Sequence, residues 1–66
     1  MKVSFDEQSD ALYLRLDQTP VAESEEVHPG VVLDYDENDR VIGVEMLGLA
    51  EHIDRAQLRS IVFEVT

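Results

Sequence analysis

Two runs of strand-forming residues separated by a polar stretch constrain this chain more than any other feature. The runs cover residues 31–35 and 41–47, and the polar stretch covers residues 36–40. Such runs around a short segment rich in Asp and Asn are typical of a β-hairpin. We therefore predict a hairpin over residues 31–47, and the other apolar segments must pair with it or pack on it.

Both runs of the hairpin carry apolar residues on both faces. Neighbouring positions are apolar in Val31-Val32-Leu33 and again in Val41-Ile42. Strands of this kind usually lie inside a sheet that is covered on its two sides. We therefore predict that these strands are central and covered, at least in part, on both faces. One short chain supplies such cover poorly, which indicates self-association.

Three segments before the hairpin also favour strands. Two of them alternate with a period of two rather than 3.6, and the third carries glutamates of the kind found on exposed edge strands. The segments are residues 2–5, 11–16 and 21–27. Polar residues 6–10 and the Pro29-Gly30 pair are expected to form turns between them.

The C-terminal part of the chain is predicted to hold a short helix and a last strand. Asp54 can accept hydrogen bonds from the first-turn amides of a helix over residues 55–60, with Gln57 three positions further on. Residues 61–65 again alternate as a strand does. The expected fold is one α+β, β-dominated domain over residues 1–66. It comprises a small antiparallel sheet of five or six short strands and one short C-terminal helix.

The charge balance narrows the classes of partner. Fifteen Asp and Glu residues against five Lys and Arg residues give a formal charge of −10. This opposes direct binding to nucleic-acid phosphates and to anionic membranes, both of which rely on Lys and Arg. A basic protein partner would instead be steered toward such a surface. The plain alternative is that the acidity keeps a small protein soluble.

Size and cysteine content point to a dimer in a reducing compartment. A chain of 66 residues builds a marginal core, and natural domains of this size usually add disulfides, a metal or a partner. No cysteine is present, which fits the cytoplasm and removes disulfides and thiolate metal sites. No segment has the length of a membrane span or of a signal-peptide core. We therefore expect a cytoplasmic homodimer.

One set of acidic residues could bind a cation. Their spacing matches positions 1, 3, 5 and 12 of a calcium-binding EF-hand loop, which coordinates the ion through side-chain oxygens. The candidate ligands are Asp34, Asp36, Asn38 and Glu45. Position 6 of that loop requires glycine, and Asp39 stands there, while the flanking segments favour strands instead of helices. The alternative is an ordinary polar hairpin loop, and no metal site is assigned.

Other chemistry-bearing residues do not form a recognisable constellation. His28 and His52 each stand alone in polar segments without a second histidine at ligand spacing. Asp6 and Asp10 bracket a turn and could pair as acid and base, but turn chemistry accounts for both. No glycine-rich phosphate loop or nucleophile–histidine–acid pattern is present. We therefore expect no enzymatic activity, no catalytic residue and no cofactor.

Three runs carry a resemblance to a known family. They are FDEQSDALYL at residues 5–14, VVLDYD at 31–36 and VIGVE at 41–45. Together they resemble the family of short prokaryotic proteins known as domain-of-unknown-function family 2283. The resemblance implies a small β-rich domain with no agreed activity, and members look like antitoxin halves of toxin–antitoxin pairs. It offers no catalytic residues, and residues 51–66 lie beyond its pattern.

These observations favour a non-enzymatic protein-interaction module. Its acidic surface would bind a basic protein, such as a ribonuclease-like toxin neutralised by an antitoxin. The alternative is a cation- or small-ligand-binding domain that uses the acidic hairpin tip.

Overall fold

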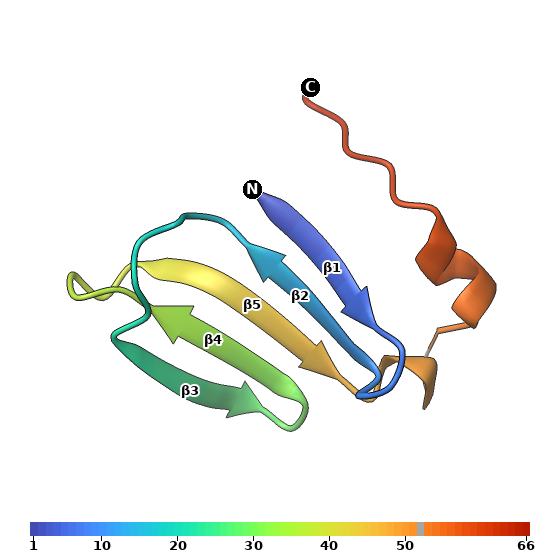
Figure 1. Ribbon diagram of the computed structural model, residues 1–66, viewed down its shortest axis with the longest axis horizontal. Coiled ribbons are helices and arrows are strands. Elements are labelled where there is room, and N and C mark those ends of the chain that lie inside the picture. Colours follow the sequence, from blue (N-terminus) through green and yellow to red (C-terminus); the bar gives the residue numbers. More distant parts are fainter. Residues whose placement is uncertain (52) are drawn as a thin grey trace.

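A single antiparallel sheet forms most of the chain. The computed structural model describes residues 1–51 and 53–66, with the side chain of residue 55 excepted. Figure 1 shows the five strands side by side in the order β1-β2-β5-β4-β3. The strands are β1 (Lys2–Asp6), β2 (Ala11–Arg15), β3 (Glu23–His28), β4 (Val31–Tyr35) and β5 (Val41–Leu47). The predicted β-dominated antiparallel fold, with β4 and β5 as a hairpin, is confirmed.

The tight connections sit where the turn-forming residues predicted them. Gly30 takes a φ of +82° between β3 and β4, a left-handed conformation that glycine adopts without steric cost. Asp39 and Asp10 take φ values of +60° and +53°. Aspartate is one of the few residues with a side chain that tolerates this region. The position where an EF-hand loop needs glycine is therefore held in a left-handed conformation by an aspartate.

Strand pairing gathers the apolar residues on one side of the sheet. Val3, Leu14, Val44 and Leu33 are successive cross-strand partners, and Phe5, Leu12, Met46 and Val31 form a second such series. Cross-strand partners lie on the same side, as do residues two apart in a strand. We call this side the apolar face, comprising Val3, Phe5, Leu12, Leu14, Val31, Leu33, Ile42, Val44 and Met46.

The opposite side, which we call the polar face, carries the intervening residues. Ser4, Tyr13, Glu45, Val32 and Glu26 form one series of partners across the five strands. Lys2, Arg15, Gly43, Asp34 and Ser24 form the next. Val32 is therefore flanked on this face by Glu26 and Glu45 of the two neighbouring strands, and the two faces differ in character.

β4 and β5 lie inside the sheet, as predicted, but the described part of one chain supplies no second layer to cover them. Figure 1 shows the sheet as one layer with no described helix or strand lying across it. Among the described residues, the buried apolar side chains are Ile42, 2% exposed, and Leu49, 6% exposed. The reason is that every strand pairs edge to edge in the same sheet, so no second layer remains to cover it.

The C-terminal part departs from the predicted helix and strand. The connector forms one 3₁₀ turn, η1 (Leu49–Glu51), and the expected helix is a second 3₁₀ segment, η2 (Arg55–Arg59). Asp54 caps η2 by accepting from the amide of Ala56 at 3.0 Å, as predicted. Five residues are too few for a stable α-helix without extensive packing. No described helix is long and apolar enough to cross a membrane.

Residues 61–66 form no strand, so the predicted last strand over residues 61–65 is wrong. Ile61, Val62, Phe63 and Val65 are between 62% and 86% exposed. Figure 1 shows this tail running beside β1 without crossing the sheet. Alternating β-forming residues need a partner edge to become a strand, and here no backbone hydrogen bond joins the tail to β1 in the described residues.

Candidate functional site

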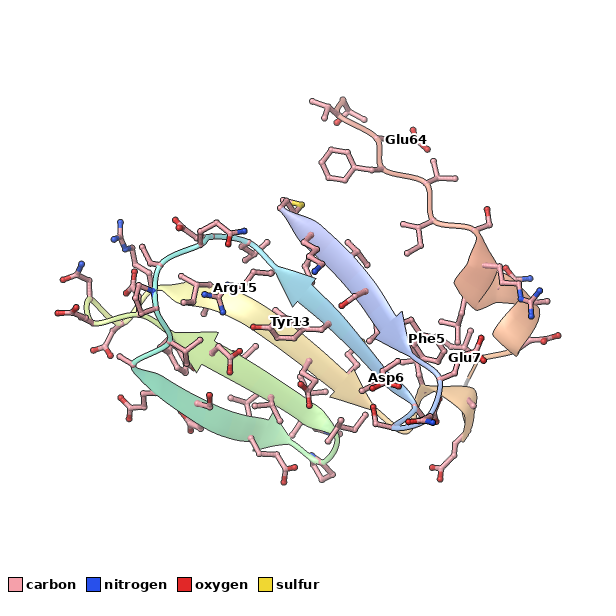
Figure 2. The ribbon with its side chains drawn as sticks, in the orientation of Figure 1. Phe5, Asp6, Glu7, Tyr13, Arg15 and Glu64 are labelled. Carbon is pink, nitrogen blue, oxygen red and sulfur yellow. The ribbon has the colours of Figure 1, made fainter. Side chains whose placement is uncertain are left out.

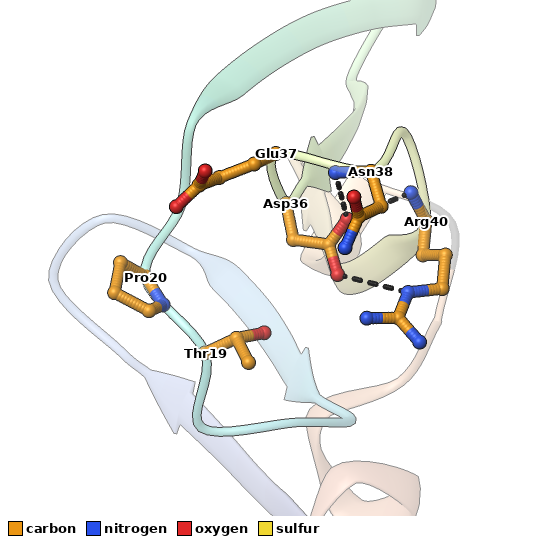
Figure 3. A pocket seen from close by; sticks show the side chains of 6 residues that line it. All are labelled: Thr19, Pro20, Asp36, Glu37, Asn38 and Arg40. Carbon is orange, nitrogen blue, oxygen red and sulfur yellow. Dashed lines mark hydrogen bonds and ion pairs between the residues drawn. The ribbon is translucent and has the colours of Figure 1, made fainter.

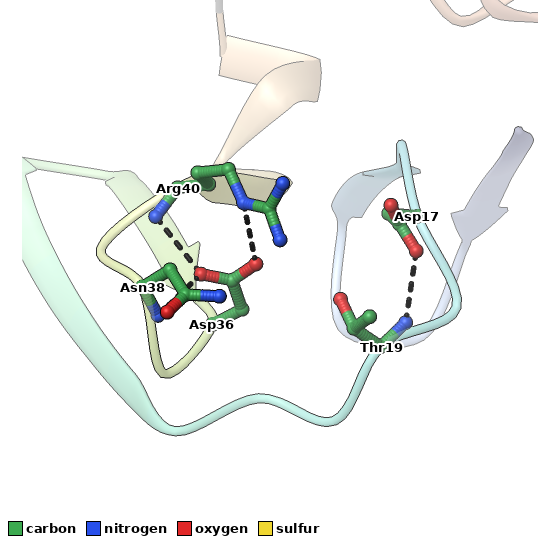
Figure 4. Close-up of polar contacts among 5 residues, drawn as sticks. All are labelled: Asp17, Thr19, Asp36, Asn38 and Arg40. Carbon is green, nitrogen blue, oxygen red and sulfur yellow. Dashed lines mark hydrogen bonds and ion pairs between the residues drawn. The ribbon is translucent and has the colours of Figure 1, made fainter.

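Asp36 organises the loop between β4 and β5. Its carboxylate accepts from the amides of Asn38 and Arg40 at 2.8 Å and 3.0 Å. It also pairs with Nε of Arg40 at 3.1 Å, as Figures 3 and 4 show. These bonds, the Arg40 amide above all, hold the pKa of Asp36 below its usual value despite the burial that would raise it. The charged carboxylate thus holds the two ends of the turn together from a buried position, because Asp36 is 5% exposed.

A shallow depression of about 200 Å³ adjoins this loop. Thr19 and Pro20, from the connection between β2 and β3, form one wall, and Asp36 and Arg40 form the other (Figure 3). The connection is fixed by the amide of Thr19, which donates to the Asp17 carboxylate at 3.0 Å (Figure 4). Because the Asp36 oxygens are already bonded, the carboxylate that this depression offers a ligand is that of the exposed Glu37.

A second network crosses the polar face. Tyr13 Oη donates to Asp34 Oδ2 at 2.7 Å, and Ser24 Oγ donates to Asp34 Oδ1 at 2.6 Å. Arg15 Nη1 donates to Tyr13 Oη at 3.2 Å. Figure 2 shows Tyr13 and Arg15 lying over the same face of the sheet. The network links β2, β4 and β3 by side chains that pass over β5.

This network requires glycine in the middle of β5. A Cβ on Gly43 would lie 2.6 Å from Tyr13 Oη and 3.0 Å from Asp34 Oδ2. Sequence reasoning assigned Asp34 to a possible ion site and missed its link to Tyr13. The available signal was the glycine itself, because glycine inside a strand often marks close approach by another group.

The four candidate cation ligands do not converge. Asp34 lies in the network on β4, Asp36 in the loop, and Glu45 on β5 beside Tyr13 and Val32. Asn38 contributes its backbone amide to Asp36. Within the described residues, no three His, Cys, Asp or Glu side chains are placed to hold a metal ion. The loop spacing of an EF-hand thus folds here as a hairpin, which separates Glu45 from the turn.

The remaining candidates have local partners. Asp6 accepts from the amide of Gln8 at 3.0 Å, as turn chemistry predicts. Asp10 accepts from the amide of Ala50, with both carboxylate oxygens within 3.1 Å, and so ties the β1–β2 turn to η1. His28 is exposed, with Nδ1 3.3 Å from its neighbour's carbonyl oxygen at Pro29. His52 lies outside the described residues.

The strongest concentration of unneutralised acid lies along β3. Glu23, Glu25 and Glu26 are exposed on this edge strand, and Asp39 lies near Glu23 and Glu25 around a depression of about 250 Å³. We call these four residues the acidic edge. β3 contains no Lys or Arg, while Arg40 pairs with Asp36 and Arg15 contacts Tyr13. The acidic edge is therefore the part of the described surface best suited to attract a basic partner.

Comparison with known proteins assigns the chain to a family whose function is unknown. No curated protein and no solved structure matches the chain. One family model, described as "Protein of unknown function (DUF2283)", matches residues 2–49. That range includes all five strands, the network on the polar face and the loop that Asp36 organises. Since the match covers well over half of the sequence, the chain belongs to the DUF2283 family.

Proposed function

We propose that this protein is a non-enzymatic interaction module whose acidic edge binds a basic protein. The observation that carries the proposal is the run of exposed glutamates on β3, on a chain of formal charge −10. Charge of one sign concentrated on a surface steers an oppositely charged partner and accelerates association. A small ribonuclease-like toxin, basic because it binds RNA phosphates, has the required chemistry, and the domain would act as its antitoxin.

Binding without catalysis is supported by the way the candidate acids are used. Asp6, Asp10, Asp34 and Asp36 each accept hydrogen bonds from within the chain that fix a turn or link segments of the fold. A general acid or base needs a carboxyl group free to reach substrate. The proposed setting is the prokaryotic cytoplasm, in keeping with a chain that has no cysteine.

Two charge-matched triple variants test the proposal. E23Q/E25Q/E26Q neutralises the acidic edge, and E7Q/E51Q/E64Q removes the same charge from exposed positions elsewhere. Partners captured from the native host with the wild-type protein would be identified, and association rates measured at several salt concentrations. We expect to capture a basic partner whose association rate falls steeply as salt is added. The variant of the acidic edge should lower that rate at least about tenfold.

The control triple should slow association much less. Equal effects of the two triples would show that net charge and not the acidic edge is responsible. A partner whose binding is insensitive to salt, or the capture of no basic protein, would contradict the proposal.

A further inference from the structure

The apolar face lacks the cover that a folded domain of this size needs. In a chain with 44% apolar residues, the described residues include just two buried apolar side chains, Ile42 and Leu49. Val3 and Met46 on the apolar face are 44% and 40% exposed. Hydrophobic burial is the main favourable term in folding. The sheet therefore supplies one apolar layer of a hydrophobic core, and a second layer must pack on it to bury these side chains.

The chain exposes more surface than a compact protein of its mass. The accessible surface of the chain is 5223 Å². A compact protein of 7.5 kDa is expected to expose about 4,200 Å², so the excess is about 1,000 Å², shared by the apolar face and the exposed tail. A stable interface buries about 800 Å² on each partner. The chain therefore exposes as much extra surface as one half of an ordinary dimer.

We infer that a second copy of this chain covers the apolar face, so that two sheets stack face to face as a ten-stranded sandwich. The same patch on both copies makes an isologous contact, in which apolar side chains from each sheet interdigitate. Stacking in this way buries no charged residue at the centre, leaves both polar faces outside, and places both acidic edges at the rim of the contact. The inference stands whether or not the acidic edge binds a basic partner.

The tail of the same chain is a poorer occupant. It lies beside β1, and its apolar residues are exposed instead of resting on the sheet (Figure 1). It also lies outside residues 2–49, the part that matches the family and holds all five strands. The apolar face thus belongs to the family unit, whereas the tail does not.

The charges favour one of the two possible twofold arrangements. Glu25 borders the apolar face on β3, as the partner of Leu33. An axis across the strands would set β3 over the partner's β3 and bring the two glutamates together. An axis along the central strand β5 instead sets β3 over the partner's β1, and places Leu14 opposite the partner's Leu33. Like charges are then kept apart, so the second arrangement is the one we infer.

Two measurements on the full chain test this dimer. Sedimentation between about 1 µM and about 100 µM should show a dimer that dissociates on dilution. In a sample that mixes isotope-labelled and unlabelled chains, nuclear Overhauser effects should connect Leu14 methyls with the partner's Leu33. A monomer at the highest concentration, or effects that connect Leu14 with Phe63 of the same chain, would overturn the inference.

A matched pair of valine variants locates the contact. V44K places a charge at the centre of the apolar face, and V32K places the same charge on the polar face of the adjacent strand, between Glu26 and Glu45. We expect V44K to weaken self-association by about 100-fold or more, because an unpaired charge would be buried in the contact. V32K should leave the dimer in place, because its charge is opposite to that of both cross-strand neighbours. Equal weakening by both variants would overturn the assignment of the face, and the labelled wild-type sample decides the question if V44K fails to fold.

Discussion

Side chains on the polar face of the sheet bond to one another, whereas most of the apolar face stays at least partly exposed. On the polar face, the Asp34 carboxylate accepts from Tyr13 and from Ser24. On the apolar face, Leu14 and Leu33 flank Val44 and remain partly exposed. Hydrogen bonds can be completed within one layer, because donor and acceptor lie side by side. Apolar side chains need atoms above them, which a single layer cannot provide.

Gly43→Ala should disturb the polar face most. The added Cβ would meet Tyr13 Oη at 2.6 Å, so the ring must move and its bond to Asp34 is lost. We expect a loss of about 2 kcal/mol in the free energy of unfolding, measured by urea denaturation at one fixed protein concentration. Tyr13→Phe alone should cost about 1 kcal/mol.

The double variant Y13F/G43A provides the control for this prediction. Removal of the hydroxyl relieves the closest contact, so the two substitutions together should cost less than the sum of their separate effects. Additive costs would mean that the position of Tyr13 does not depend on Gly43.

Asp36→Asn should give a smaller, pH-dependent loss. Because the folded state lowers the pKa of Asp36, its charge stabilises the fold above the unfolded value of about 3.9. This contribution fades as the pH falls through the folded pKa. Urea midpoints at about pH 7 and about pH 3 should show a gap between wild type and D36N that narrows on acidification. Glu37→Gln, an exposed neighbour, should give no such trend, and a constant gap for D36N would contradict the role of its charge.

Phe63→Ser should have the smallest effect. Phe63 is 73% exposed on the tail, so its loss should change the free energy of unfolding by no more than about 0.5 kcal/mol. The matched variant Phe5→Ser removes a half-buried ring from the apolar face beside Leu58 and should cost about 1–2 kcal/mol. Equal costs in thermal or urea unfolding would mean that the tail covers the apolar face in solution.

Local sequence patterns predicted the positions of the strands well, but they did not predict what covers the two faces of the sheet. The segments at residues 2–5 and 11–16 were correctly predicted as strands because the alternation of a strand is local. Whether the side chain of Val32 is covered depends on how β4 pairs with β3 and β5. The residues next to Val32 in the sequence do not encode that pairing. The tail looked like a strand because its composition is that of one, but strand formation also requires a partner edge.

The same limit applied to the candidate site. The Asp-rich loop was correctly predicted as the turn of a hairpin, because Asp and Asn favour turns through local bonds. The bond between Tyr13 and Asp34 joins residues that are 21 positions apart. It becomes visible only when β2 and β4 are known to flank β5.

The strand order has a consequence for the folding rate of the chain. The β1–β2 hairpin and the β3–β4–β5 meander each form from neighbouring segments, and the pairing of β2 with β5 joins them. That pairing must close the long intervening loop before it gains any stabilising contact. We therefore expect the β2–β5 pairing to be the late step in refolding, after the two local units have formed. Stopped-flow refolding in which Leu14→Ala slows folding no more than Val3→Ala, its partner within the β1–β2 hairpin, would bear this out, and a clearly greater slowing by Leu14→Ala would place the β2–β5 pairing in the folding nucleus.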